Sequence, residues 1–310
     1  MTHIASFLQK YVSSKQKIIL ACSGGPDSIF LLYKILETPY AKNLVVCYFD
    51  HKLRRASKKE RLFIQALGEK HSFICEIEEC DIKKEQKGLP STWTEELARI
   101  KRYEFLEKIR EKYDAPYILT AHHLDDRLET FFFNLARGSK LTGLINMTEK
   151  SGHILRPLLG FEKEEILAFL KKKKISFMVD ASNHNTKISR NHLRINTLPQ
   201  FKKINAQYKK NIANFLEYLW LAKWYIDEEI KDFLWESNYF PIDVFLEKPI
   251  FFQKEVIRYI FYVCNNQSHI GLTEGNIKEV IRFIWGKNNK TKKDIKKMKL
   301  YKDGNKLFFV

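Results

Sequence analysis

The segment KIILACSGGPDS (17–28) joins a short apolar run to a loop of glycines and serines. The apolar run predicts a buried strand, and residues 27–37 repeat apolar side chains at helical spacing. Between a strand and a helix, free backbone N–H groups and the positive end of the helix dipole can hold an anion. Pro26 suits this position because the first helical N–H makes no helix bond. The segment therefore predicts a phosphate-binding loop.

The same alternation of apolar runs and helical patterns continues to about residue 175. The further apolar runs are LVVCYFD (44–50), FICEIE (73–78) and YILTAH (117–122), and helical patterns lie near 57–71 and 93–112. This alternation predicts an α/β fold in which helices cover both faces of a parallel sheet. Such sheets bind ligands beyond the carboxyl ends of their strands, where Asp50, His51 and the segment HHLDDRLET (122–130) fall.

The chain changes character after residue 204. Aromatic-rich segments such as NIANFLEYLWLAKWYIDEEIKDFLW (211–235) repeat apolar residues at helical spacing, which indicates packing. We therefore expect a catalytic domain over 1–204 and a smaller, mainly helical and basic domain over 205–310. The end of the chain, MKLYKDGNKLFFV (298–310), predicts a hairpin that turns at Asp303 and Gly304.

The net charge of +17 favours a polyanionic partner such as nucleic acid. Nine lysines between residues 286 and 306 would suit phosphate contacts, although a solvated charged surface explains them equally well. The chain shows neither an apolar run long enough to span a membrane nor a signal-peptide pattern, so we expect a cytoplasmic protein. Five scattered cysteines without a CxxC pair indicate neither a disulfide framework nor a zinc site.

Asp27 is the informative residue of the loop. A carboxylate inside a phosphate cradle would repel its ligand, unless it binds a Mg²⁺ ion that bridges to the phosphates. The other loop residues would hold the phosphates through backbone N–H groups and hydroxyls, and Asp50 and His51 are further candidates for nucleotide binding. The phosphate-holding residues are Ser23, Gly24, Gly25, Pro26 and Ser28.

A second group of charged residues follows YILTAH. On a helix, Asp125 or Asp126 shares a face with Glu129, three or four residues later. This spacing predicts a compact acidic cluster beside the metal-nucleotide site. Acidic residues in a first helical turn also complement the helix dipole, but that explanation leaves the preceding His122 and its neighbouring histidine unexplained.

These motifs resemble those of a known family. The loop is similar to the SGGxDS loop of the ATP pyrophosphatase superfamily, and residues 120–147 are similar to the HHxDDQxET...RGSGxxGLxGM segment of tRNA(Ile)-lysidine synthetases. Further similar segments follow in the family's order: DHKLRRAS (50–57), ELARIKRYEFL (96–106), RPLL (156–159) and DASNHNTKISRNHLRINTLP (180–199). The chain departs from the pattern at Lys52, Arg127, Lys140 and Asn185.

The resemblance implies an adenine nucleotide alpha hydrolase-like fold and a two-step ligation that uses ATP and Mg²⁺. Cytidine O2 in the CAU anticodon of an isoleucine tRNA would be adenylated, and the ε-amine of free L-lysine would then displace AMP. The basic C-terminal domain would bind the tRNA. The sequence leaves open whether the protein dimerises.

Roles for single residues follow from this implied reaction. The expected metal ligands are Asp27 and Asp126; the catalytic residues are these two with His122, Glu129 and Arg190. Substrate contacts are expected from Arg99, Arg102, Asp125, Asp126, Glu129 and Arg194, since guanidinium groups bind anions in a bidentate way and carboxylates bind an ammonium.

Two other functions are compatible with parts of the sequence. A tRNA-thiolating relative would commonly carry catalytic cysteines, often as CxxC, and this chain has none at that spacing. A basic RNA-binding protein without catalysis would be expected to lose Asp27 or the acids at 125–129, and the chain keeps them.

Overall fold

The computed structural model describes residues 3–52, 57–85, 94–145, 147–178, 192–235, 237–266, 271–286 and 288–310. The chain forms two compact units, Met1–Phe215 and Leu216–Val310. The division falls inside the long helix α11 (Tyr208–Leu234), later than the expected boundary at 204.

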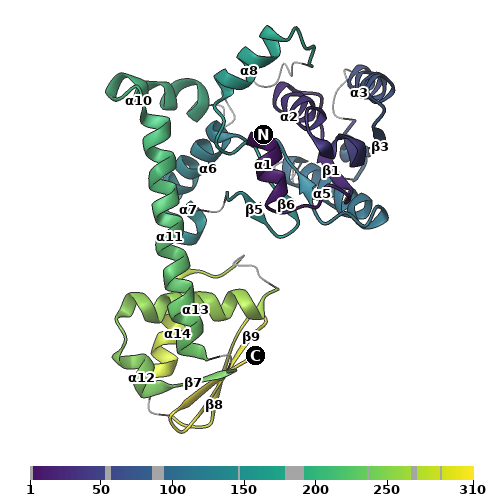
Figure 1. Cartoon of the computed structure of the whole chain (residues 1–310). Helices are drawn as coiled ribbons and strands as arrows, with labels where there is room; N and C mark the ends of the chain where they lie inside the picture. The colour runs from purple at the N-terminus through teal and green to yellow at the C-terminus, as the bar shows by residue number, and fades with distance from the viewer. Residues whose placement is uncertain are drawn as a thin grey trace. The chain divides into compact units, whose positions relative to one another are not determined.

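The first unit is built on a mostly parallel six-stranded sheet of order β3-β2-β1-β4-β6-β5 (Figure 1). Its strands are β1 (Ile18–Ala21), β2 (Leu44–Asp50), β3 (Ile74–Glu79), β4 (Ile118–Leu119), β5 (Lys150–Ser151) and β6 (Ile154–Leu155). Strand β5 is antiparallel to β6, and the other pairs are parallel. The parallel sheet expected from the sequence is therefore present.

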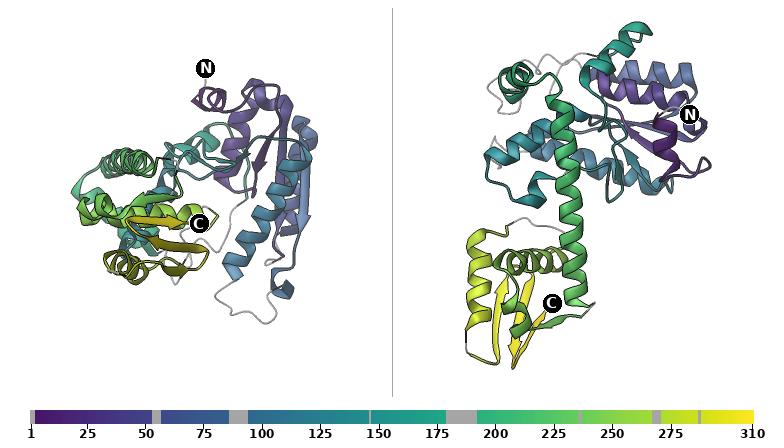
Figure 2. Two further views of the ribbon diagram at one scale, coloured as in Figure 1. Left: turned by 90° about the horizontal axis from the view of Figure 1, so that it is seen from below. Right: turned by 60° about the vertical axis from the view of Figure 1, so that its left-hand side comes forward.

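Helices cover both faces of this sheet. Successive residues of a strand point to opposite sides, so neighbouring residues pack against different helices. In β1, Ile18 and Leu20 join the apolar cluster formed by helices α1 (His3–Gln9), α2 (Pro26–Leu36), α3 (Ser57–His71) and α8 (Lys163–Lys172). Ile19 between them packs instead with Phe105 and Ile109 of α5 (Thr94–Lys112). Figure 2 shows this layered arrangement from two further directions.

The strand order positions the functional residues. The chain runs outward from β1 to β2 and β3, and then returns to place β4 on the other side of β1. Such a reversal opens a crevice beyond the carboxyl ends of the two strands, where α/β proteins bind ligands. The loop 22–25 after β1 and the segment 120–123 after β4 both reach this crevice, and α6 (Leu124–Ala136) begins there.

Shorter elements complete the first unit. They are η1 (Pro39–Asn43), α4 (Ile82–Glu85), α7 (Leu141–Leu144), the π-helical turn η4 (Leu193–Thr197) and α10 (Leu198–Ile204).

The second unit combines helices with a four-stranded antiparallel sheet of order β7-β10-β9-β8. It contains the end of α11, β7 (Tyr239–Pro241), α12 (Ile242–Glu247), α13 (Ile250–Cys264), α14 (Glu274–Trp285), β8 (Thr291–Ile295), β9 (Met298–Asp303) and β10 (Lys306–Phe309). The predicted hairpin is confirmed, since β9 and β10 pair across a turn in which Gly304 has a φ of 55°. Within the described residues, no helix is long and apolar enough to cross a membrane.

Candidate functional site

The loop between β1 and α2 has the backbone that its glycines allow. Gly24 has a φ of +78°, which L side chains rarely adopt, and its carbonyl accepts a hydrogen bond from Met178 N at 2.9 Å. Gly25 caps α2 in an extended conformation, Pro26 takes the first turn, and no side chain caps this helix N-terminus. The helix start therefore keeps backbone donors that an anion can use.

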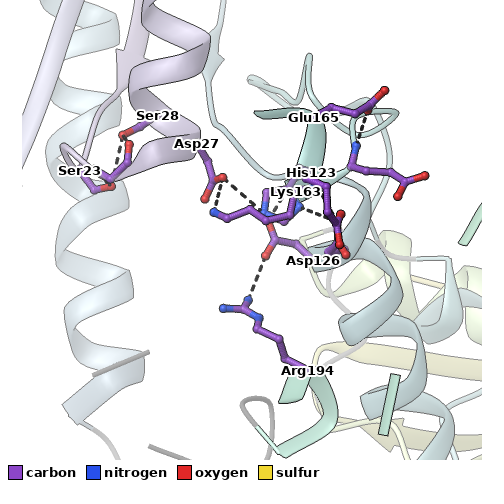
Figure 3. Close-up of polar contacts among 12 residues, drawn as sticks. Ser23, Asp27, Ser28, His123, Asp126, Lys163, Glu165 and Arg194 are labelled. Atoms are coloured by element: carbon purple, nitrogen blue, oxygen red, sulfur yellow. Dashed lines mark hydrogen bonds and ion pairs between the residues drawn. The ribbon is translucent and has the colours of Figure 1, made fainter. Parts of the chain in front are cut away.

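The two serines shape this loop. Ser28 Oγ donates to Gly25 O at 3.0 Å and lies 3.4 Å from Ser23 Oγ, while Gly25 N donates to Ser23 Oγ at 3.4 Å. Because its hydroxyl proton is used inside the loop, Ser28 stabilises the cradle rather than offering a free donor to it (Figure 3). The loop is thus closed by its own hydrogen bonds and fits a phosphate group.

His123 connects the loop to the start of α6. Its Nε2 lies 3.6 Å from Asp27 Oδ1 and 3.5 Å from Asp126 Oδ2, and its Nδ1 lies 3.6 Å from Asp125 Oδ2. The backbone N–H of His123 also donates to Asp126 Oδ2 at 3.0 Å, as in a capping box. Burial opposes protonation, but the surrounding carboxylates outweigh it and raise the pKa of His123. One imidazole thus brings three carboxylates of the sequence motifs together (Figure 3).

The buried Glu129 and the more exposed Arg194 form a bidentate pair beside this histidine. Arg194 Nε donates to Glu129 Oε1 at 2.5 Å and Nη2 donates to Oε2 at 2.9 Å. The same Nη2 lies 3.5 Å from Asp126 Oδ1. The hydrogen bond to Glu129 raises the pKa of Arg194, so this guanidinium stays charged. Arg194 therefore joins η4 to the acidic face of α6.

The loop and the acids line one cavity of about 680 Å³, called the acidic cavity below. Six carboxylates and four cationic side chains face it: Asp27, Asp125, Asp126, Glu129, Glu162 and Glu164, with Lys163, Arg194, Lys202 and Lys209. Ser23, Gly25, Pro26 and His123 also line it. An excess of carboxylates inside a chain of net charge +17 creates a local site for cations.

A second cavity of about 340 Å³ lies on the other side of the loop. It shares Ser23, Gly25, Asp27 and Met178 with the acidic cavity. Its other lining residues include Phe49, His51, Arg102, Tyr103, Thr120 and His122. The phosphate-binding loop therefore borders both cavities, and a ligand held by the loop can extend into both.

The adjacent histidines face different cavities. His123 has extended backbone angles, so it and its neighbour point to opposite sides, His123 into the acidic cavity and His122 into the second cavity. His122 Nδ1 lies 2.9 Å from Thr120 Oγ1, and burial lowers the pKa of His122 to about 4. The sequence led us to expect His122 beside the acids at 125–129. In the structure, His123 lines the acidic cavity with them instead.

Other expected site residues are distributed as follows. Arg102 and His51 line the second cavity, whereas Asp50 is buried and accepts a hydrogen bond from Lys52 N at 2.7 Å. Asp50 and Gly24 belong to neither lining. Arg99 is also outside both linings and lies over the ring of Tyr103, 4.9 Å from its centroid. Arg190 falls outside the described residues, as do most of the segment 180–199 and residues 53–56.

Three lysines that the sequence analysis did not select line the acidic cavity, and Lys163 and Lys209 pair with its carboxylates. Lys163 Nζ lies 2.5 Å from Asp27 Oδ1, and Lys209 Nζ lies 2.7 Å from Asp125 Oδ1. Lys209 also contacts Glu164 at 2.8 Å. Lys163 could have been noticed because it begins the helix after RPLLG, but nothing near Lys209 in the sequence sets it apart from the many other lysines.

Lys209 should stabilise the first unit. Its Nζ is mostly buried among carboxylates of α6 and α8, and although burial opposes it, these carboxylates raise the pKa of Lys209. We expect Lys209→Met to lower the free energy of unfolding by about 2 kcal/mol, because it leaves Asp125 without its ammonium partner. Chemical denaturation measures this loss, and Lys210→Met, at the exposed neighbouring residue, is the control. Equal stability of the two variants would contradict the prediction.

His122 gives the folding stability a pH dependence. Its pKa of about 4 in the folded chain lies below the unfolded value of about 6.5, so the unfolded chain takes up the proton first. We expect the free energy of unfolding to fall as pH decreases from about 6.5 towards 4, and His122→Asn to flatten this fall. Denaturation curves across that range measure it. A midpoint near 6.5 in an NMR titration of His122 would show the assignment to be wrong.

The donor set on the loop fits a hard cation. No group of three or more histidine, cysteine or acidic residues among the described parts of the chain forms a ready metal site. Nucleotide-bound Mg²⁺ needs only one or two protein carboxylates, because phosphates and water complete its coordination. Asp27 Oδ1 and Asp126 Oδ2 lie 3.6 and 3.5 Å from the same nitrogen of His123, so two carboxylates are near the loop for such an ion.

A loop of this kind at the reversal point of a parallel sheet defines a nucleotide-binding protein of the PP-loop class, and residues 1–201 match the model of the PP-loop domain. The chain belongs to this family. Within it, the chain is similar to tRNA(Ile)-lysidine synthases: it is 36% identical over 239 residues to that of Thermosipho africanus and 31% identical over 256 residues to that of Thermotoga maritima.

These matches cover 75% and 79% of this chain but 55% and 60% of the relatives, so the chain spans little more than half the length of those proteins. Among solved structures, the U34-tRNA thiolase NcsA from Methanococcus maripaludis aligns with a TM-score of 0.57 at 15% identity. That alignment covers 70% of this chain and 77% of the thiolase, and it supports the fold alone.

Proposed function

We propose that this protein ligates free L-lysine to C2 of the wobble cytidine in a CAU-anticodon isoleucine tRNA, through an ATP-derived adenylated cytidine. One observation carries the proposal: the phosphate-binding loop and the acids at 125–129 line the same cavity. The kinship with tRNA(Ile)-lysidine synthases supports the choice of reaction. The substrates would meet in the cytoplasm, where tRNA is modified.

The two cavities suggest where the nucleotide binds. The shared loop would hold the phosphates, and the second cavity would take the adenosine between Arg102 and His51. The α-phosphate would then face the acidic cavity, where cytidine O2 attacks it and pyrophosphate leaves. Mg²⁺ bound to Asp27 and Asp126 would neutralise charge on the phosphates. Backbone N–H groups in the first turn of α2, which no side chain caps, would stabilise the leaving pyrophosphate.

The second step requires an uncharged amine. Lysine has a reference pKa of about 10.4, so deprotonating it at pH 7 costs about 4.6 kcal/mol. The acidic cavity attracts the ammonium, and a carboxylate must accept its proton as the amine nitrogen bonds to C2 and AMP leaves. Because His122 faces the second cavity, we assign this acceptor role to the acids at 125–129 and the positioning of lysine to Asp126 and Glu129.

The cysteines support ligation over thiolation. All five lie in described parts of the chain, and burial raises the pKa of every one of them. A cysteine that attacks a substrate needs a thiolate, hence a lowered pKa. The thiol nearest to the loop, Cys22, is buried and lies 3.6 Å from Ser28 Oγ.

The second unit would bind the tRNA through its lysines. Most lysines of β8, β9 and their flanking turns are exposed, which suits contacts with a phosphate backbone. Lys302 is an exception, since it is buried and donates to Ile284 O at 2.9 Å, at the end of α14. We assign Lys302 to folding and the exposed lysines to RNA binding.

The proposal is tested by incubating the protein with labelled lysine, ATP, Mg²⁺ and bulk tRNA. We expect label in the tRNA only when all components are present, together with release of AMP and pyrophosphate. ATP–pyrophosphate exchange that depends on tRNA but not on lysine would identify the first step. Exchange without transfer of lysine would mean that a nucleophile other than lysine reacts in the second step. The absence of both exchange and transfer would refute the proposal.

A further inference from the structure

The ammonium of Lys163 pairs with Asp27, the carboxylate that the proposed function assigns to the metal ion. Its Nζ lies 2.5 Å from Asp27 Oδ1 (Figure 3). The side chains of Lys163 and Asp27 are 32% and 27% exposed, so this ion pair is within reach of solvent. An arriving cation can therefore displace the ammonium without unfolding the site.

The backbone of Lys163 is held in place while its side chain is long. Lys163 N donates to Asp125 Oδ2 at 2.9 Å, and the helix that it begins is capped by Glu165 on Glu162 N at 2.8 Å. Helix α8 packs against α2 through the apolar cluster that contains Ile166. The backbone of Lys163 is thus fixed beside the loop, while the four methylene groups of its side chain let the ammonium reach neighbouring positions.

Charge balance indicates where the ammonium goes when the metal takes Asp27. A nucleoside triphosphate adds several negative charges to a cavity that already has more carboxylates than cationic side chains. Arg194 is held by Glu129, and Lys209 is held by Asp125 and Glu164. Lys163 differs from these two because its carboxylate partner, Asp27, is a proposed Mg²⁺ ligand, whereas the nearest carboxylates to Arg194 and Lys209 are Glu129 and Asp125.

We propose that Lys163 is an exchanging counter-ion: it neutralises Asp27 without nucleotide and binds the nucleotide phosphates once Mg²⁺ occupies Asp27. This inference rests on the proposed use of Mg²⁺ and ATP. The exchange keeps the loop carboxylate paired in both states, because an unpaired, partly buried charge is costly. It also makes Mg²⁺ compete with an internal cation unless the phosphates arrive with it.

Removing the ammonium should therefore change two affinities in opposite directions. In Lys163→Met, Asp27 loses its ammonium partner and keeps the more distant imidazole of His123 at 3.6 Å, so divalent cations should bind more tightly in the absence of nucleotide. ATP at saturating Mg²⁺ should bind more weakly, by about 10-fold, because one charge-assisted phosphate contact is missing. A residue that only supports the local structure would weaken both.

The experiment measures Mn²⁺ binding without nucleotide by electron paramagnetic resonance, and ATP binding at saturating Mg²⁺ by calorimetry, both without tRNA. Lys171→Met, at an exposed site on the same helix, is the matched control. We expect tighter Mn²⁺ and weaker ATP in Lys163→Met, and ATP affinity near the wild-type value in Lys163→Arg. Two unchanged affinities, or two weakened ones with the same loss in Lys163→Arg, would overturn the inference. Wild-type protein that binds neither ligand would instead refute the proposed function.

Discussion

Asp27→Asn is expected to lower the rate of tRNA-dependent ATP–pyrophosphate exchange by about 10²- to 10³-fold. The substitution keeps the shape of the side chain but removes the charge that would bind Mg²⁺ at the start of α2. Lys163 then loses its partner and adds a positive charge near the phosphates, which preserves some ATP binding without correct metal placement. The loss should therefore appear mainly in the rate and less in the KM for ATP.

The matched control is Glu279→Gln, which removes an exposed carboxylate paired with Lys293 on the second unit. It should leave exchange unchanged. Glu279→Gln should also unfold at nearly the same denaturant concentration as the wild type, since an exposed ion pair contributes little to stability. Asp27→Asn leaves the ammonium of Lys163 without its carboxylate, so a denaturation curve must show that this variant is folded under the conditions of the exchange assay. Exchange by Asp27→Asn within a few-fold of the wild-type rate would remove Asp27 from the metal site.

Glu129→Gln is expected to raise the KM for lysine about 30-fold or more, while ATP–pyrophosphate exchange stays largely intact. Glu129 is buried, and its oxygens accept both hydrogen bonds from Arg194. A carboxylate has further acceptor positions, so it can also attract the lysine ammonium. The variant loses the negative charge and frees Arg194, which then repels that ammonium. Steady-state kinetics with lysine as the varied substrate measures the effect.

Arg194→Met separates two roles of Glu129. If Glu129 attracts lysine directly, Arg194→Met should keep the KM for lysine nearer to the wild-type value than Glu129→Gln does. If Glu129 serves only to hold Arg194, the two variants should behave alike. Equal loss of exchange and of lysine transfer in Glu129→Gln would refute the assignment to the second step.

The convergence of the loop and the acids could be predicted because it follows from strand order. Parallel strands present their carboxyl ends at one edge, so residues after KIILAC and after YILTAH must meet there. This holds even though β4 contains only Ile118 and Leu119, much less than the apolar run suggested. The turn at Gly304 was predictable for a similar reason, since a local backbone requirement determines it.

The cavity that each histidine side chain faces, and the ion pairs between distant residues, could not be predicted in the same way. The motif contains two adjacent histidines, and only the extended backbone at His123 decides which one meets the acids. The pairing of Lys209 with Asp125 joins residues far apart in the sequence, and one lysine among many carries no local signal. In the sheet of the second unit, the β9–β10 hairpin was predicted, but β8 was missed because it consists mostly of polar residues.

The proposed function requires a strongly basic protein to bind a cationic amino acid, and the acidic cavity offers a place for it. The net charge of +17 would attract the proposed tRNA over a screening length of about 8 Å. At contact distance, the six carboxylates of the acidic cavity determine the local preference. Long-range attraction of an anion and short-range binding of Mg²⁺ and lysine can therefore coexist in one chain.

The most direct test of one shared site is a crystal structure with a non-hydrolysable ATP analogue, Mn²⁺ and lysine. We predict an anomalous Mn²⁺ peak at the carboxylate of Asp27, phosphates on residues 23–28, and the lysine ammonium beside Asp126. A nucleotide bound elsewhere, or a metal peak away from both Asp27 and Asp126, would contradict the account.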